Sequence, residues 1–203
     1  DGGPATAGTQ LEGDQIGARF GYSVAAAGDV DADGFPDFVV GAPAYDADQV
    51  DEGAAFVFLG GADGIASGGP SSAATQLEGD QPGSVSNQCE GLFGCSVAGG
   101  DWDGDGYADV VVGSPFHDSG QSDEGLAFLF RGGPDGIADA GSGAADERFE
   151  ANFAGIWLGW STALADMDDD GAADAFAGAW AFGDPPSNIF TGDPGHGGEG
   201  AVF

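Results

Sequence analysis

The sequence predicts an all-β fold built from three copies of one repeat. Glycine accounts for 41 of the 203 residues, and short apolar runs alternate with glycine-rich joints, a pattern typical of short strands linked by tight turns. No helical periodicity is found along the chain. The segments FGYSVAAAGD from Phe20, FGCSVAGGD from Phe93 and LGWSTALAD from Leu158 match one another, so each copy is expected to form a sheet of four short strands.

The strands are expected at equivalent positions in each copy. The first copy places them near residues 20–28, 37–42, 54–59 and 75–79, and the second near 93–99, 109–113, 125–130 and 147–151. The third copy places them at 158–165, 174–179 and 199–203, and its fourth strand is missing. Thr9 to Gly13, in contrast, has the sequence of a fourth strand with no copy before it.

An acidic loop follows the first strand of every copy. It reads DVDADGFPD from Asp29 to Asp37, DWDGDGYAD from Asp101 to Asp109 and DMDDDGAAD from Asp166 to Asp174. Aspartates stand at relative positions 1, 3, 5 and 9, with glycine at position 6. A short turn of this kind directs four carboxylates at one point, where they repel one another unless a cation lies among them.

Calcium is the predicted cation, with one ion in each loop. All the ligands are hard oxygen donors, with no cysteine or histidine among them, which favours calcium over zinc or a softer metal. The backbone carbonyl at position 7 is expected to add a further oxygen. The predicted ligands are Asp29, Asp31, Asp33, Phe35, Asp37, Asp101, Asp103, Asp105, Tyr107, Asp109, Asp166, Asp168, Asp170, Ala172 and Asp174.

These loops differ from EF-hand loops, which need a glutamate at position 12 and a helix on each side. Position 12 is Val40, Val112 or Ala177, inside an apolar run that predicts a buried strand. A single match could be an acidic turn that binds nothing, but three matches in one repeat context favour metal binding. The simplest expected role of the calcium is structural.

The composition excludes some classes of binding partner and indicates the cellular compartment. The formal charge is −32, from 35 acidic residues against three basic ones, so nucleic acid and anionic membranes are poor partners. No window reaches the roughly 18 apolar residues of a membrane helix and no signal peptide is present. A mature secreted form is expected, outside the cell or on its surface, because extracellular calcium fills weak sites. The acidic surface fits a saline habitat, solubility at high calcium or cationic partners alike.

Cys89 and Cys95 are separated by EGLFG in an apparent insertion. A short-range disulfide between them would suit an oxidising compartment, and two free thiols are the alternative.

No constellation of catalytic residues is found. Ser23, Ser96 and Ser161 stand in G-x-S settings, but a nucleophile elbow needs a following helix with histidine and acidic partners. His117 and His196 do not occupy corresponding positions. The chain is therefore not expected to be an enzyme.

Two other sets of residues have weaker claims to function. Acidic residues that follow the second strand occur at equivalent positions in the first and second copies. Loop residues of this kind are more often solvated than bound to a metal. Tryptophans could stack on a sugar ring, although in glycine-rich sheets they usually form core. The sets are Asp46, Asp51 and Glu52 with Asp118, Asp123 and Glu124, and Trp102, Trp157, Trp160 and Trp180.

The stretch FGYSVAAAGDVDADGFPDFVVGAP resembles the FG-GAP repeat of integrin alpha-subunit β-propellers and of many bacterial secreted proteins. The second copy keeps Phe93-Gly94 and ends in Gly113-Ser114-Pro115, whereas the third has drifted to Leu158-Gly159 and Gly178-Ala179-Trp180. The resemblance implies four-stranded propeller blades around an axis, with calcium in the turn between the first two strands. It divides residues 1–203, a single repeat domain, into an N-terminal outer strand (1–19), blade 1 (20–92), blade 2 (93–157) and an incomplete blade 3 (158–203).

Three blades are few for a closed propeller. We therefore expect the N-terminal strand of one chain to complete the third blade of a neighbour, which gives a filament or a ring, the alternative being a truncated longer propeller. The expected function is that of a structural calcium-binding repeat protein whose main partner is itself. An adhesin or lectin that binds glycans or a cell-surface protein, and the propeller of a larger secreted protein or enzyme, are the alternatives.

Overall fold

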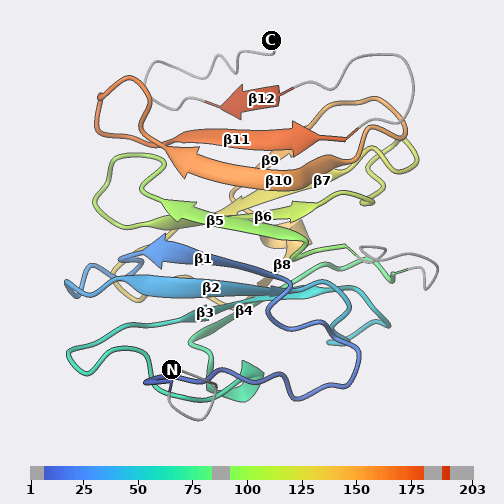
Figure 1. The fold of residues 1–203 in the computed structure, drawn as a ribbon. Helices are drawn as coiled ribbons and strands as arrows, with labels where there is room; N and C mark the ends of the chain where they lie inside the picture. The colour runs from blue at the N-terminus through green and yellow to red at the C-terminus, as the bar shows by residue number, and fades with distance from the viewer. Residues whose placement is uncertain (1–6, 84–91, 181–188, 193–203) are drawn as a thin grey trace.

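The computed structural model describes residues 7–83, 92–180 and 189–192, the last segment by its backbone alone. In this part of the chain the regular structure consists of strands and short 3-10 turns, so the predicted all-β fold is confirmed. The strands form three sheets that lie one above another (Figure 1).

The first sheet has the order β1-β2-β3-β4-β8. We expected four strands from the first repeat, but a short segment of the second repeat pairs in parallel with the outer strand, at Leu77↔Ala140 and Glu78↔Gly141. The sheet is therefore five-stranded and ties two repeats together. Its strands are β1 (Ser23–Gly28), β2 (Asp37–Ala42), β3 (Ala54–Phe58), β4 (Thr75–Glu78) and β8 (Ala140–Gly141).

The second sheet is antiparallel and has the order β5-β6-β7-β9. The apolar run of β6 is buried along its whole length, because the first and third sheets cover both of its faces. Its strands are β5 (Ser96–Gly100), β6 (Asp109–Ser114), β7 (Leu126–Phe130) and β9 (Glu147–Glu150).

The third sheet contains β10 (Leu158–Ala165), β11 (Asp174–Ala179) and β12 (Ile189–Gly192), paired antiparallel in this order. The prediction placed its third strand at residues 199–203, because GEGAVF there matches DEGAAFVF of the first repeat. In the structure β12 takes the place beside β11, while residues 199–203 lie outside the described part of the chain.

Apolar side chains fill the space between neighbouring sheets. Val39, Val57 and Leu77 of the first sheet pack against Val110 and Phe128 of the second, and all five are buried. A second cluster joins the second and third sheets. A third cluster lies on the opposite face of the first sheet, where the described residues supply no further sheet. The structure is thus a stack with one core per pair of sheets.

The innermost strands of adjacent sheets meet at a repeated joint. The carbonyl oxygen of Gly94 accepts a hydrogen bond from Ser23 Oγ at 2.8 Å, and that of Gly159 accepts one from Ser96 Oγ at 2.8 Å. Each of these glycines has a left-handed φ, +90° and +86°, and lies against the backbone of the preceding sheet. Only glycine combines this conformation with so close an approach.

The outer strand of the first sheet is held against the second repeat by a fixed set of contacts. Thr75 Oγ1 donates to the carbonyl oxygen of Ile137 at 2.5 Å. Further along, Gln81 Nε2 donates to the carbonyl oxygen of Asp118, while the backbone N–H of Asp118 donates to Gln81 Oε1. These bonds orient the Gln81 amide so that Nε2 also faces His117 Nε2 at 3.1 Å, which requires an unprotonated ring nitrogen. Burial, with Arg148 nearby, lowers the pKa of His117 to about 4.

The N-terminal segment repeats this arrangement against the first repeat. Thr9 Oγ1 donates to the carbonyl oxygen of Ile65 at 2.6 Å, Leu11 forms a parallel bridge with Gly68, and Gln15 exchanges two hydrogen bonds with Asp46. Thr9–Glu12 therefore occupies the position of an outer strand. Among the described residues, no third strand pairs with its other edge.

No helix in the described part of the chain is long and apolar enough to cross a membrane. Cys95 is disulfide-bonded. Cys89, its predicted partner, lies outside the described residues.

Candidate metal centres

The three acidic loops connect the first two strands of each sheet and lie on the same side of the stack, at the left of Figure 1. They join β1 to β2, β5 to β6 and β10 to β11. Because the sheets are stacked in register, the loops form a column along one edge of the molecule. The predicted sites therefore share one structural context.

The first aspartate of each loop organises the turn. In the first loop, Asp29 Oδ1 accepts the backbone N–H of Asp33 at 3.0 Å and Oδ2 accepts that of Gly34 at 2.8 Å. Asp101 and Asp166 accept the equivalent N–H groups in the other loops. The carboxylate thus holds the backbone of positions 5 and 6 around itself.

The glycine at position 6 has a left-handed backbone in all three loops. Its φ is +94° at Gly34, +94° at Gly106 and +97° at Gly171. Side-chain sterics disfavour this conformation in other residues by about 1–2 kcal/mol. The predicted need for glycine at the sharp turn is met.

The aspartate at position 9 closes the loop from the following strand. Asp37 Oδ2 accepts the N–H of Val30 and Oδ1 that of Gly60, both at 2.7 Å. Asp109 makes the same pair of bonds with Trp102 and Gly132. These two carboxylates are almost completely buried, at 3% and 1% exposure.

Burial, together with the charges of neighbouring loop aspartates, raises the pKa of Asp37 and raises that of Asp109 to about 6. Backbone hydrogen bonds oppose these effects without cancelling them. The buried, closely spaced carboxylates of each loop therefore repel one another when they are all ionised. A divalent cation bound among them would reduce this repulsion.

Carboxylate oxygens converge in each loop to within 4.8 Å of one another. The groups differ slightly: positions 1, 3 and 5 meet in the first and third loops, whereas positions 1, 3 and 9 meet in the second, where Asp105 is not in the group. The ligand role of the carbonyl oxygens of Phe35, Tyr107 and Ala172 stays a prediction. The groups are Asp29, Asp31 and Asp33; Asp101, Asp103 and Asp109; and Asp166, Asp168 and Asp170.

The second loop also carries a cation of the protein itself. Arg131 Nη1 lies 2.9 Å from Asp103 Oδ2, and its guanidinium carbon lies 5.1 Å from the centre of the Trp102 ring. This contact could not be predicted from the sequence, because Arg131 follows β7 and reaches Asp103, between β5 and β6, only across the sheet. The second loop therefore has less net negative charge than the other two.

The residues fit a calcium ion. The donors are carboxylate oxygens, the hard ligands that calcium prefers. In addition, Asp103, a member of the converging group of its loop, has a buried Oδ1 without a hydrogen-bond partner in the described part of the chain. A buried carboxylate oxygen of this kind is costly unless a cation or water satisfies it.

Two of the acidic residues considered for a second metal set accept backbone hydrogen bonds within their own loops. Glu52 Oε1 accepts the backbone N–H groups of Ala47, Asp48 and Gln49 at 3.1, 2.6 and 2.8 Å. Glu124 does the same for Ser119 and Gln121. Both glutamates are buried, and neither belongs to a metal-type cluster in the described residues.

Comparison with known proteins follows the repeats. The FG-GAP repeat model matches residues 20–58 and 93–130. Over 178 residues the chain is 34% identical to integrin alpha-IIb of Homo sapiens, covering 84% of this chain and 16% of that subunit. It is 32% identical over 193 residues to integrin alpha-5 of Xenopus laevis (91% and 17%), and 38% identical over 133 residues to integrin alpha-PS2 of Drosophila melanogaster (62% and 9%).

The chain thus spans less than a fifth of the length of these relatives. Both family matches begin at the FG dipeptide and contain the whole acidic loop and the following strands. The chain is therefore an FG-GAP repeat protein related to integrin alpha subunits.

Proposed function

We propose that this chain is a non-enzymatic, extracellular module of the adhesion-related kind, in which calcium has a structural role. The observation that supports this most directly is the convergence of carboxylate oxygens within 4.8 Å in each of the three loops. Each loop joins the two innermost strands of its sheet. An ion held there stiffens the turn from which the sheet extends.

In this proposal the aspartates at positions 1, 3 and 5 hold the ion in the first and third loops, and Asp101, Asp103 and Asp109 do so in the second. Calcium supplies positive charge at a point where carboxylates otherwise repel one another. At a free concentration of 100 times its dissociation constant, an ion stabilises the folded state by about 2.7 kcal/mol per site. That is a large part of the about 5–15 kcal/mol typical of a domain.

Thermal unfolding with calcium, with magnesium and with EGTA tests this role. We expect calcium to raise the melting temperature and EGTA to lower it, with a smaller effect of magnesium because it demands a stricter octahedral geometry. Asp31→Asn should weaken calcium binding measured by calorimetry. Asp63→Asn, which removes the same charge from an exposed position outside the loops, should not. A melting temperature that does not respond to calcium would exclude the proposed role.

We also propose that copies of the chain assemble head to tail by strand donation. Thr9–Glu12 lies against the first repeat as β4 lies against the second, through equivalent hydrogen bonds. The difference is on the other edge, where β4 pairs with β3 but the described residues offer Thr9–Glu12 no such strand. A third-repeat sheet of a neighbouring copy would supply it.

The outer face of the first sheet supports the same arrangement. Val24 is 57% exposed, whereas Val97, its counterpart in the second sheet, is 7% exposed because the first sheet covers it. A hollow of about 520 Å³ lies beside Leu11 and Phe38. The face therefore matches one that is buried between two sheets elsewhere in the same chain.

Electrostatics sets the conditions for assembly. With a net charge of −32, copies repel one another at low ionic strength. Salt screens this repulsion over a distance of about 8–10 Å near physiological strength, and calcium reduces the charge itself. Assembly should therefore be favoured by salt and by calcium.

Sedimentation velocity and negative-stain electron microscopy test the assembly. We expect particles larger than the monomer, in the form of filaments or rings, and a shift to monomers when residues 1–13 are deleted. Leu11→Pro is the more local variant, because successive residues of a strand direct their N–H groups to opposite edges. It removes an N–H from the unpaired edge and leaves the bond from Glu12 N–H to Gly68. Particles that persist in both variants would contradict strand donation.

A recognition module is the second candidate, favoured by the integrin alpha relatives. In that case the chain is part of a larger secreted protein, and its loops bind a cell-surface protein or glycans. A glycan array and binding to intact cells, with and without calcium, test this alternative.

A further inference from the structure

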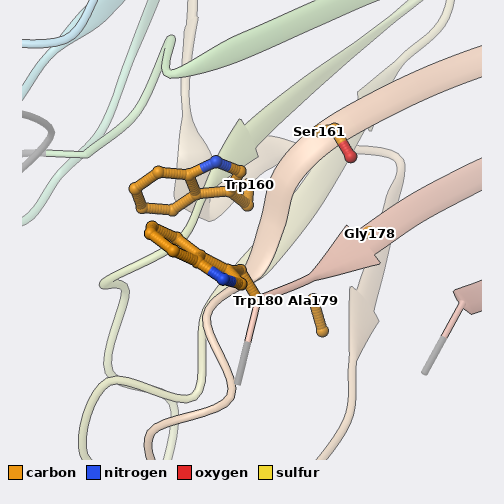
Figure 2. A pocket seen from close by; sticks show the side chains of 5 residues that line it. All are labelled: Trp160, Ser161, Gly178, Ala179 and Trp180. Carbon is orange, nitrogen blue, oxygen red and sulfur yellow. The ribbon is translucent and has the colours of Figure 1, made fainter. Parts of the chain in front are cut away.

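A hollow of about 460 Å³ lies on the third sheet at the level of the joint between sheets, lined by Trp160, Ser161, Gly178, Ala179 and Trp180. In Figure 2 the two tryptophan rings lie next to each other at one side, and Ser161 follows Trp160 on β10. The rings are 4.7 Å apart, centre to centre, and Trp180 is 45% exposed. The hollow is distinct from the acidic loops, which lie at the other ends of the strands (Figure 1).

The residues of this hollow have counterparts in both internal joints. Ser161 and Gly178 pair in register across β10 and β11, as Ser23 and Gly41 pair across β1 and β2 and as Ser96 and Gly113 pair across β5 and β6. In those two sheets the serine hydroxyl donates to the carbonyl oxygen of a left-handed glycine of the next sheet, at 2.8 Å each time. Ser161 is exposed, and its hydroxyl has no such acceptor among the described residues.

The paired glycine explains the shape of the hollow. A Cβ atom added at Gly41 would lie 2.1 Å from the carbonyl oxygen of Gly94, and one added at Gly113 would lie 2.1 Å from that of Gly159. For a Cβ atom at Gly178, the three nearest atoms in the described part of the chain all belong to Ser161 of the same sheet. As far as the structure describes the chain, the third sheet therefore presents the half of the joint that accepts a glycine from a further sheet.

The first sheet presents the opposite half. Gly21 has a φ of +86°, close to the +90° of Gly94 and the +86° of Gly159. Gly94 and Gly159 are packed so closely that an added Cβ atom would lie 2.3 Å and 2.2 Å from a backbone oxygen of the preceding sheet. At Gly21 an added Cβ atom would meet nothing within 4 Å.

We propose that the hollow at Ser161 and Gly178 receives Gly21 of a second copy of this chain, with Ser161 Oγ donating to the Gly21 carbonyl oxygen. This inference rests on the proposed head-to-tail assembly and adds a contact at the inner end of the interface, far from the donated outer strand. The second copy is the occupant because the chain itself contains the complementary half, in the conformation that both internal joints use. Tyr22, 48% exposed beside Gly21, comes to lie near Trp180 when the joint forms, as Trp160 lies near Phe116 in the internal joint.

Gly21→Ala tests the joint. In the separate chain the new methyl group meets no neighbour, whereas in the joint it collides with the backbone of the second copy, so we expect the dissociation constant of assembly to rise at least 100-fold. Gly120→Ala is the matched control, because Gly120 is also left-handed, with a φ of +104°, and has nothing within 4 Å. It introduces the same kind of backbone strain away from the joint and should assemble like the unaltered chain.

Ser161→Ala provides a second test that leaves the backbone unstrained. Loss of one hydrogen bond should raise the dissociation constant about 3- to 10-fold. Sedimentation velocity over a concentration series measures all these variants, and circular dichroism verifies that each one is folded.

The outcomes separate this inference from the proposed function. If residues 1–13 are needed for assembly but Gly21→Ala and Ser161→Ala assemble normally, the joint is wrong and strand donation stands. If Gly21→Ala falls to monomers and Gly120→Ala does not, the joint is supported. A chain that stays monomeric in calcium and salt at every concentration overturns the second copy as the occupant, and with it the proposed assembly.

Discussion

Truncation of two equivalent leucines provides a direct test of the uncovered face of the first sheet. Leu77, in the outer strand β4, is 0% exposed and belongs to the core between the first and second sheets. Leu11 occupies the equivalent position in Thr9–Glu12, but it is only half-buried and borders a hollow of about 520 Å³. Leu77→Ala and Leu11→Ala therefore remove the same atoms from equivalent positions. The position of Leu77 is enclosed between two sheets, whereas that of Leu11 is open on one side.

The difference in cost follows from burial. Removing three buried carbons loses about 2.4 kcal/mol of transfer free energy, at about 0.8 kcal/mol for each CH₂ group. At Leu77 the closed surroundings leave a cavity, which brings the total to about 3–4 kcal/mol, within the about 2–5 kcal/mol typical of such substitutions. At Leu11 part of the side chain already contacts solvent and no closed cavity forms, so we expect about 1–2 kcal/mol.

Urea unfolding, at concentrations where the chain sediments as a monomer, measures both effects. With a slope of about 2 kcal/mol per molar urea, Leu77→Ala should lower the midpoint by about 1.5–2 M and Leu11→Ala by about 0.5–1 M. At higher concentrations Leu11→Ala should also weaken assembly, because strand donation buries this side chain. Equal midpoint shifts in the monomer would show that Leu11 is as enclosed as Leu77 and would refute the uncovered face.

Three further predictions concern individual side chains. Burial favours the neutral form of His117, so the folded state is more stable above pH 6.5 than at lower pH. This contribution, on the order of 2–3 kcal/mol, is lost as the pH falls toward 4. The free energy of unfolding should therefore depend less on pH in this range in His117→Gln. Arg131→Leu removes a cation from Asp103 and should increase calcium affinity at the second loop about 3- to 10-fold in calorimetry, since exposed ion pairs contribute about 0–1 kcal/mol and the guanidinium also repels the ion. Glu52→Ala leaves three loop N–H groups without their acceptor and should cost about 2–3 kcal/mol in urea unfolding, whereas Glu52→Gln, which keeps an oxygen for them, should cost less.

Much of the fold could be predicted because the same pattern of strands and loops occurs in each repeat. The full extents of β2, β10 and β11 and the starts of β4, β6 and β9 were predicted from the sequence, since glycine or acidic loops mark where each apolar run ends. Strand β12, which pairs with β11, was not predicted, because Ile189–Gly192 lacks the motif that marks the third strands of the other repeats. The parallel strand β8 was missed because two residues are too short to show a periodicity.

The candidate metal centres were also readable in outline. Four aspartates and a glycine at fixed spacing define the loop, since local backbone geometry within nine residues decides which carboxylates can meet. The sequence did not predict which three carboxylates converge in each loop. Asp37 and Asp109 are both buried and make equivalent backbone hydrogen bonds, yet only Asp109 joins the converging group of its loop.

The sequence by itself determined the all-β repeat architecture, the FG-GAP family and the position of the acidic loops, because each of these depends on residues close together in the chain. Only the tertiary structure decided that Arg131 reaches Asp103, and that Ser23 and Ser96 each donate a hydrogen bond to a glycine of the next sheet. The first contact crosses a single sheet, whereas the others arise from the stacking of sheets, which brings together residues from different repeats. The residue pattern of a single strand does not predict which sheet faces stay exposed after the sheets have stacked.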